Sequence, residues 1–371
     1  MNPIYVARPI VPDLAEYTEL LTIAFKNRRL TNGAALVSTL QLRLAEILRA
    51  PHVSLLSNGT VAIEIAARAL GMSGKVITTP FTFPATLSAL LWIGLEPILV
   101  DIEDEFLTID PGKIEEDMTK DISGIVGVHV YGNPCDLPRI DAIARKREIP
   151  VLYDGAHVFD ATYDGEAIVN AGDATTLSFH ATKYFNTAEG GAVIAADPAI
   201  AERVANLKNF GIKAEDQIVD IGINGKMSEL NAALGLANLN SLHAEKMQRQ
   251  SVINTYNDVL HGQDGIRVLP TRPGTSERFQ YFTVRIPGDG KLSPRDRVYN
   301  SLREKGIFAR RYFWPLLSDV PVFRSRLSQG SFSFPVAERA AAEVLVLPLH
   351  GGVSIDDAAR IGNELIGALN G

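Results

Sequence analysis

The sequence predicts an α/β protein with a mostly parallel sheet flanked by helices and a smaller C-terminal α+β domain. From about residue 50, short apolar runs alternate with helical patterns, which is the order that builds a parallel sheet. The runs are nearly continuous in Val, Ile and Leu, as strands buried on both faces are. A length of 371 residues favours two domains. The pattern changes after Leu234, so we expect a large domain over residues 1–240 and a small one over residues 241–371.

The elements of the large domain follow in order along the chain. The strands are expected at seven apolar runs, namely Val53–Leu56, Val76–Thr79, Pro97–Asp101, Gly124–Val130, Val151–Tyr153, Thr175–Ser178 and Ala192–Ala195. Helical patterns separate the earlier runs at Val61–Leu70, Ala85–Ile93, Pro111–Met118 and Leu137–Arg147. Apolar residues at helical spacing and strict alternation are the signals that distinguish the two kinds of element.

The small domain is expected to begin within one long helix, Leu239–Leu260. The segment Phe279–Arg285 alternates in polarity and predicts a strand with one face exposed. Three further helices are expected at Pro294–Glu304, Pro335–Leu345 and Ile355–Leu369.

Composition excludes several classes of function. The net charge is -7 and no Lys/Arg-rich run is present, which argues against a nucleic-acid partner. Cys135 is the single cysteine, so no intramolecular disulfide forms, as in a reducing compartment. The first residues lack an apolar run of signal-peptide length, and runs such as Leu87–Leu95 are far too short to span a membrane. We therefore expect a cytoplasmic protein without a membrane partner.

An aspartate and a lysine about thirty residues apart point to pyridoxal 5′-phosphate (PLP). Asp154 ends a predicted apolar strand, and Lys183 lies in a small-residue loop after Ser178. A buried aspartate needs a cationic partner, and a protonated pyridine nitrogen is one, while the lysine amine bonds to the PLP aldehyde. In apolar surroundings its pKa should be lowered, which favours that bond. Each residue alone has a plain alternative: Asp154 as a helix cap and Lys183 as a solvated side chain.

Four further residues fit the rest of such a cofactor. Gly59 and Thr60 lie where a predicted strand turns into a helix, and the N–H groups and dipole of a helix N-terminus attract an anion. Phe83 follows the next strand and is preferred over Phe81 as a residue that stacks on a flat ring. His157 is placed to hydrogen-bond the phenolic oxygen of the cofactor. Ordinary helix capping and core packing are the alternatives.

These motifs resemble the fold-type-I PLP enzymes, and among them the DegT/StrS-type sugar-nucleotide aminotransferases. The matching segments are Leu30–Gly33, Ser57–Thr60, Pro80–Thr86, Asp154–His157, Ser178–Lys183, Glu189–Gly191, Asn224–Ser228 and Leu347–His350. The resemblance implies that Lys183 binds PLP covalently and that Asp154 pairs with the pyridine nitrogen, with His157 beside the ring and Phe83 stacked on it.

The resemblance also assigns the phosphate and the oligomer. Gly59, Thr60 and Ser178 would hold the cofactor phosphate, and Asn224 would reach the phosphate bound by a neighbouring subunit. A homodimer with shared active sites is thereby implied. No metal site is expected.

The substrate is inferred from a late segment in which this chain departs from the family. Members commonly carry a His in the corresponding Tyr-Pro-Leu-His region, whereas here the run is Arg310 to Leu317. It resembles most the subgroup that aminates dTDP-4-keto-6-deoxyglucose at C4, with Arg311 and Tyr312 contacting the substrate and L-glutamate as donor. The products of such enzymes typically enter O-antigen, lipopolysaccharide or another surface glycan.

Several alternatives remain at this point. A C3 keto-sugar aminotransferase of the same family and a non-catalytic PLP-binding regulatory protein both fit the motifs. A PLP-dependent sugar dehydratase carries a His in place of Lys183, which argues against that activity. Cysteine desulfuration needs a mobile catalytic cysteine, and Cys135 is far in sequence from the lysine loop.

Overall fold

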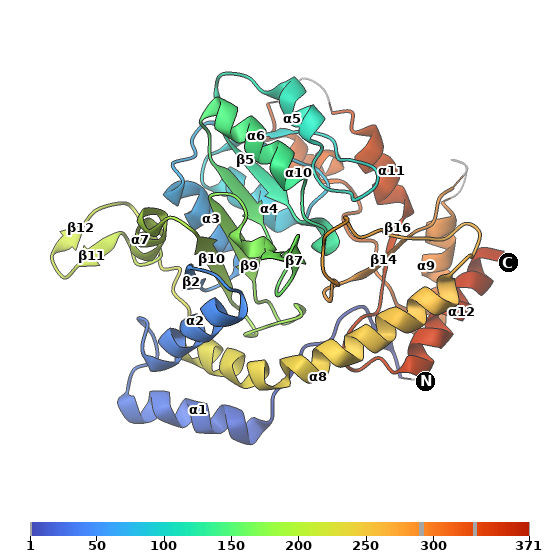
Figure 1. The fold of residues 1–371 in the computed structure, drawn as a ribbon, viewed down its shortest axis with the longest axis horizontal. Coiled ribbons are helices and arrows are strands. Elements are labelled where there is room, and N and C mark those ends of the chain that lie inside the picture. Colours follow the sequence, from blue (N-terminus) through green and yellow to red (C-terminus); the bar gives the residue numbers. More distant parts are fainter. Residues whose placement is uncertain (1, 289–292, 329–331, 371) are drawn as a thin grey trace.

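A seven-stranded sheet forms the centre of the computed structural model, which describes residues 2–288, 293–328 and 332–370 (Figure 1). Its strand order is β2-β10-β9-β6-β5-β3-β4. The strands are β2 (His52–Leu56), β3 (Lys75–Thr78), β4 (Glu96–Leu99), β5 (Ile122–Val128), β6 (Val151–Asp154), β9 (Ala174–Ser178) and β10 (Gly191–Ala195). Only β10 runs antiparallel to its two neighbours; the other pairs are parallel. The predicted mostly parallel sheet is confirmed.

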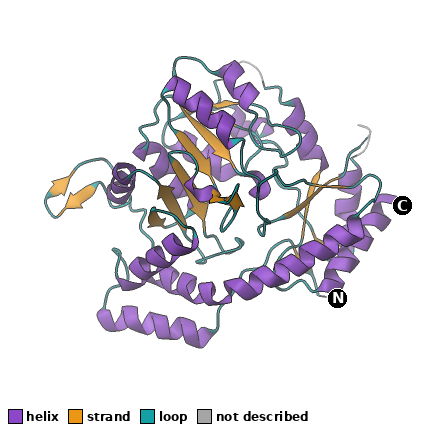
Figure 2. Cartoon of the chain, in the orientation of Figure 1, coloured by secondary structure: helices purple, strands orange, loops and turns teal. Residues whose placement is uncertain are grey.

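Helices cover both faces of this sheet, as Figure 2 shows. The large-domain helices are α1 (Leu14–Asn27), α2 (Ala35–Ile47), α3 (Gly59–Ala69), α4 (Pro84–Trp92), α5 (Pro111–Asp117), α6 (Leu137–Arg147) and α7 (Pro198–Leu207). Along β2, Val53 and Leu55 pack into the cluster that contains residues of α2, whereas Leu56 packs into the cluster that contains α3. Alternate residues of one strand therefore bury against opposite layers, which explains the continuous apolar strands.

A long helix, α8 (Glu229–Leu260), links the sheet to the C-terminal half (Figure 1). That half contains a small antiparallel sheet of β13 (Arg267–Val268), β14 (Phe282–Arg285) and β16 (Val344–Leu347). Its other elements are α9 (Pro294–Glu304), β15 (Ile307–Phe308), α10 (Pro321–Arg324), α11 (Pro335–Glu343) and α12 (Ile355–Asn370). Near the N-terminus, β1 (Ile4–Tyr5) pairs with β15. The division at about residue 240 stays a prediction.

The remaining elements are short. They are β7 (Thr162–Tyr163), β8 (Glu166–Ala167), β11 (Ile212–Ala214), β12 (Gln217–Ile218) and the 3₁₀ turns η1 (Val130–Gly132), η2 (Ile168–Asn170) and η3 (Leu317–Asp319). The β11–β12 hairpin projects from the body of the molecule in Figure 1. None of the helices in the described ranges is long and apolar enough to cross a membrane.

Four predicted elements differ most from the structure. The helix predicted over Pro335–Leu345 ends at Glu343, and Val344–Leu347 forms the strand β16. The long helix begins ten residues earlier than Leu239, because Ser228 caps it and its first turns carry small residues that pack closely: a Cβ on Gly235 would lie 2.7 Å from Thr187. The strand predicted from Phe279 begins only at Phe282, and its expected exposed face is buried. Val130 belongs to a turn and not to the preceding strand.

Candidate active site

A pocket of about 270 Å³ opens at the carboxyl ends of the central strands. Asp154 is the last residue of β6 and Ser178 the last of β9, and these strands are parallel neighbours. Strand ends at one edge of an α/β sheet are where such folds bind ligands. The polar and aromatic residues on its wall include Asn58, Gly59, Thr60, Thr82, Phe83, Asp154, His157, Ser178, His180, Lys183, Glu189, Tyr281, Arg310, Tyr312 and Phe313.

Asp154 is a buried carboxylate held by two hydrogen bonds. Thr86 donates its hydroxyl to Oδ2 at 2.7 Å, and the backbone N–H of Ala156 donates to Oδ1 at 3.1 Å. Thr82 lies 2.8 Å from the Thr86 hydroxyl, which extends the chain of hydroxyls. Among the ion pairs between described residues, none includes Asp154. A buried carboxylate with neutral donors only is suited to a cationic ligand.

Lys183 lies in the irregular loop between β9 and β10, partly buried on the pocket wall. Burial lowers the pKa of its amine to about 8, and the nearby charge of Asp154 opposes that shift. At pH 7 about a tenth of an amine with this pKa is neutral, far more than of an ordinary lysine, and the neutral form is the nucleophilic and proton-accepting one.

The first turn of α3 offers the pocket its anion-binding end. Asn58 caps the helix by accepting from the N–H of Val61 at 2.9 Å, while Gly59 and Thr60 line the pocket. A Cβ on Gly59 would lie 2.8 Å from the Cβ of Ser178. Glycine therefore lets the helix N-terminus come close to the Ser178 hydroxyl, and a phosphate suits the N–H groups and hydroxyls gathered there.

Aromatic residues separate into core and pocket. Phe81 is fully buried and packs edge-on against Tyr131 and Phe313. Phe83 is 47% exposed and lines the pocket, which matches the preference for Phe83 as the stacking residue. Phe81 packs in the core, which was the predicted alternative to stacking on a cofactor ring.

His157 is buried against the same wall. Its ring is edge-on to Tyr281 at 4.9 Å. Burial holds the pKa of His157 well below its ordinary value, with Lys183 and His129 adding to the shift and a hydrogen bond to the His129 backbone opposing it. The imidazole is therefore neutral and can serve as a hydrogen-bond partner without adding charge.

Two predicted site residues lie elsewhere. Asn224 is exposed and does not line this pocket; its expected contact with the cofactor phosphate of a neighbouring subunit stays a prediction. Arg311 also lies outside the lining: it pairs with Asp296 at 2.9 Å, and its guanidinium lies 4.1 Å from the Trp314 ring centroid. Arg310 lines the pocket instead, with its guanidinium 4.8 Å from the ring centroid of Tyr312.

The sequence reasoning missed Thr86, Tyr281 and Arg310 as residues of this site. Thr86 belongs to the matching segment Pro80–Thr86 and lies four residues after Thr82. Its position shortly after a predicted strand is a local signal that could have assigned it to the site. Tyr281 comes from a segment more than a hundred residues after Asp154, and no local pattern places it there.

The residues present fit PLP. A carboxylate that forms no ion pair with another described residue, a lysine of lowered pKa, a half-exposed phenylalanine and a helix N-terminus beside Ser178 meet in one pocket. These match the pyridine nitrogen, the aldehyde, the ring face and the phosphate of that cofactor. The individual roles of these residues stay predictions.

Comparisons with known proteins give a consistent picture. The DegT/DnrJ/EryC1/StrS aminotransferase family model matches residues 13–366. A dTDP-4-amino-4,6-dideoxy-D-glucose transaminase of Shigella dysenteriae is 40% identical and covers 96% of each chain. One of Escherichia coli is 36% identical and covers 98% of each. The crystal structure of DesI in the presence of its TDP-sugar product has a TM-score of 0.93 and 33% identity, and the match covers 100% of this chain and 93% of DesI.

Proposed function

This chain belongs to the DegT/DnrJ/EryC1/StrS aminotransferase family, and from that premise we propose that it aminates dTDP-4-keto-6-deoxyglucose at C4. The product would be dTDP-4-amino-4,6-dideoxyglucose, with L-glutamate as the amino donor. The family is PLP-dependent, and the chain is a sugar-nucleotide aminotransferase. The reaction rests on one observation, the meeting of Lys183 and Asp154 in one pocket. The choice of sugar rests on the two dTDP-sugar relatives.

The pocket residues have complementary tasks. Bound PLP supplies an aldehyde for attachment of the amine and a ring that withdraws electrons from the reacting carbon. The Asp154 carboxylate would hold a proton at the pyridine nitrogen, and its hydrogen bonds from Thr86 and Ala156 fix its direction. Phe83 would limit movement of the ring from one face, and the neutral His157 would donate to or accept from its phenolic oxygen.

Lys183 would move the protons. Its amine, with a pKa of about 8, would take the proton from the α-carbon of glutamate and return it to the carbon that carried the aldehyde of PLP. In the second half of the cycle the same amine would move protons in the opposite direction on the keto-sugar. One base of lowered pKa therefore serves both directions, and ping-pong kinetics follow because 2-oxoglutarate leaves before the sugar binds.

We infer a homodimer from the exposed residues near Asn224. Ile221 is 81% exposed, and Ile218 on the projecting hairpin is also strongly exposed. Apolar residues gathered at one projection favour contact with another protein surface. A second copy docked there would cover them and bring Asn224 to the partner's cofactor phosphate. From the sequence and the family we also propose that the enzyme acts in the cytoplasm, in deoxysugar nucleotide synthesis for O-antigen, lipopolysaccharide or another surface glycan.

The test begins with the absorption spectrum of the purified protein with PLP. A visible band that disappears with L-glutamate supports the first half-reaction. The glutamate-treated enzyme is then separated from excess donor and mixed with dTDP-4-keto-6-deoxyglucose. Return of the band, with nitrogen located at C4 by NMR of the product, supports the proposal. A parallel reaction contains the 3-keto isomer, and nitrogen at C3 of that sugar favours the C3 alternative. A band that neither L-glutamate nor other amino acids remove favours a binding-only protein.

A further inference from the structure

We propose that Gln280 is a positioning residue for Lys183. Its side-chain amide contacts the backbone on both sides of the lysine: Oε1 accepts from the N–H of Tyr184 at 2.7 Å, and Nε2 donates to the carbonyl of Thr182 at 3.2 Å. Gln280 is 5% exposed. One buried amide thus fixes both peptide groups flanking the lysine, and this inference rests on the proposed role of Lys183.

The lysine loop needs support from outside because it has no strand partner. Residues 179–190 connect β9 to β10 without regular structure. Hydrogen bonds within the loop hold its two ends together. The backbone N–H of Phe179 donates to the carbonyl of Gly190, and the backbone N–H of Thr187 donates to the carbonyl of Phe179. At the centre of the loop, the backbone N–H of Lys183 donates to the carbonyl of His180 at 2.8 Å. The next donor along the chain, the N–H of Tyr184, bonds to Gln280.

The segment that carries Gln280 is itself anchored. Arg249 of α8 donates from Nη1 to the carbonyl of Phe279 at 2.8 Å, directly before Gln280. The same guanidinium pairs with Glu245 at 2.7 Å and lies 5.2 Å from the Tyr184 ring centroid. Arg249 is almost completely buried, so its partners are fixed by the cost of leaving a buried charge unpaired. The long helix, the Gln280 segment and the lysine loop therefore form one polar unit.

The geometry indicates what Gln280 does for the reaction. Rotation of the two peptide planes around Lys183 would swing its Cα–Cβ bond, and the amine is several bonds farther out. Small angular freedom at the backbone becomes a large displacement of the amine, and misplacement of about 1 Å can cost about a hundredfold in rate. Gln280 removes that freedom from a distance without touching the reacting atoms. Its contribution comes from the C-terminal half, whereas Lys183 lies in the loop between two strands of the central sheet.

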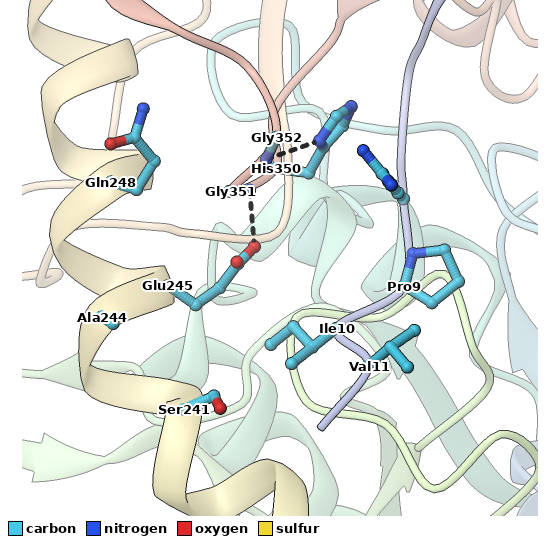
Figure 3. Close-up of a pocket in the computed structure, with 11 residues that line it drawn as sticks. Pro9, Ile10, Val11, Ser241, Ala244, Glu245, Gln248, His350, Gly351 and Gly352 are labelled. Carbon is cyan, nitrogen blue, oxygen red and sulfur yellow. Dashed lines mark hydrogen bonds between the residues drawn. The ribbon is translucent and has the colours of Figure 1, made fainter. Parts of the chain in front are cut away.

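The test uses Gln280→Leu, which keeps the size of the side chain and removes both hydrogen bonds. The matched control is Gln248→Leu. Gln248 lies on α8 beside a separate cavity of about 490 Å³, shown in Figure 3 with Glu245 and His350. Its Nε2 donates to the carbonyl of Val353 at 2.6 Å. The control therefore removes an amide-to-carbonyl bond in the same half of the chain without touching residues 182–184.

Two readouts precede any assay of turnover. In the enzyme freed of PLP, hydrogen–deuterium exchange of the peptide containing Tyr184 reports whether its N–H has lost its partner. The rate at which that enzyme captures added PLP on Lys183, trapped with borohydride and measured by mass spectrometry, reports the placement of the amine. Gln280→Leu should exchange faster and capture PLP at least about tenfold more slowly, whereas Gln248→Leu should match the unmodified enzyme in both.

Each contrary result has a definite meaning. Equal exchange and capture rates in Gln280→Leu and the unmodified enzyme would overturn the proposal. Equal losses in both variants would also overturn it, because they would reflect general destabilisation. Gln280→Glu keeps an oxygen for Tyr184 and should restore protection from exchange; its failure to do so would exclude the acceptor role. Absence of PLP capture by the unmodified enzyme would count against the proposed function instead. The exchange comparison would still test whether Gln280 holds the backbone around Lys183.

Discussion

The two walls of the pocket are held by different forces. On the sheet side, Asp154 and Ser178 stand at strand ends, and Asp154 is fixed by hydrogen bonds from Thr86 and Ala156. The C-terminal wall depends mainly on ring packing, to which the Tyr131 hydroxyl adds a hydrogen bond by donating to the carbonyl of Tyr312 at 2.9 Å. Tyr281 lies 5.0 Å from Tyr312, Tyr131 stacks on Phe313 at 5.3 Å, and Arg310 lies over Tyr312.

This difference separates chemistry from recognition. Hydrogen bonds at strand ends fix direction closely, as acid–base groups require. Ring packing fixes the contact area and the shape of the pocket. It tolerates the exchange of one aromatic residue for another, whereas a hydrogen bond is lost when either partner is replaced. We therefore expect changes on the sheet wall to affect turnover and changes on the C-terminal wall to affect substrate affinity.

The largest effect should come from Lys183→Ala. Loss of the proton-moving amine should lower kcat by more than about a thousandfold, measured as glutamate-dependent amination of the keto-sugar. Lys208→Met is the control, because Lys208 is also buried and burial lowers its pKa to about 8, but it donates to the carbonyl of Leu55 outside the pocket. Substantial turnover by Lys183→Ala, or equal loss in the control, would refute the assignment.

Asp154→Asn should have the next largest effect. The amide keeps the shape of the side chain and removes the charge that would hold the pyridine proton, so kcat should fall by about a hundredfold or more. Asp101→Asn provides the comparison, since Asp101 is equally buried and accepts from Val336 and Ala337 at the start of α11. That variant should lose stability and keep turnover. Near-normal rates in Asp154→Asn would mean that the pairing is misassigned.

The pH dependence of PLP capture tests the same pair. Capture needs the neutral amine, so the capture rate of the PLP-free enzyme should increase with pH. The midpoint of that increase should lie near pH 8, the lowered pKa of Lys183. Since Asp154 raises the pKa of Lys183, Asp154→Asn should move the midpoint below 8.

The corresponding effect on stability has a definite sign. Between pH 8 and the ordinary lysine value, the unfolded chain binds more protons at Lys183 than the folded chain. The stability contributed by this group therefore rises with pH in that window and is lost as pH falls through 8. A capture midpoint close to the ordinary lysine value would contradict the burial of the amine.

On the C-terminal wall, Arg310 and Arg311 should behave differently. Arg310→Ala should raise KM for the nucleotide sugar about tenfold with a smaller change in kcat, because the pocket loses a cation suited to a phosphate. Arg311→Ala breaks the contacts with Asp296 and Trp314 and should lower the free energy of unfolding by about 1 kcal/mol. Steady-state kinetics and chemical denaturation of both variants measure these two effects. A larger increase of KM in Arg311→Ala than in Arg310→Ala would mean that Arg311, and not Arg310, binds the substrate.

Sequence reasoning predicted one wall better than the other for a physical reason. Asp154, Ser178 and Gly59 occupy the ends of strands or the start of a helix, and parallel topology brings those ends to one edge whatever the distant chain does. The order of apolar runs was therefore enough to place them together. The first ten residues of α8 were not predicted as helix, because the small residues Ala and Gly, most of them buried here, give a weak helical periodicity of hydrophobicity.

The other wall depends on tertiary packing that no local pattern encodes. Gln280, which lies outside the pocket lining, follows Phe279 in a stretch that alternates like a strand, yet its side chain reaches the lysine loop about a hundred residues earlier. Arg310 and Arg311 are adjacent and chemically identical, and only the contacts of Arg311 with Asp296 and Trp314 show which of them faces the pocket.

The smallest expected effect tests whether the hydrogen bonds on the sheet wall act through Asp154. Thr86→Val keeps the shape of the residue, removes the 2.7 Å bond to Oδ2, and should lower kcat by about threefold to tenfold, since a hydrogen bond to a charged group contributes about 1.5–3 kcal/mol and only part of that is specific to the reaction. Thr86→Ser should restore most of the rate. In an Asp154→Asn background the same Thr86→Val change should have little further effect, because the charge that its hydroxyl stabilises is already gone. If the two losses simply multiply in that double-mutant cycle, Thr86 acts by packing alone, and the sheet wall would owe less to directed bonds than its geometry indicates.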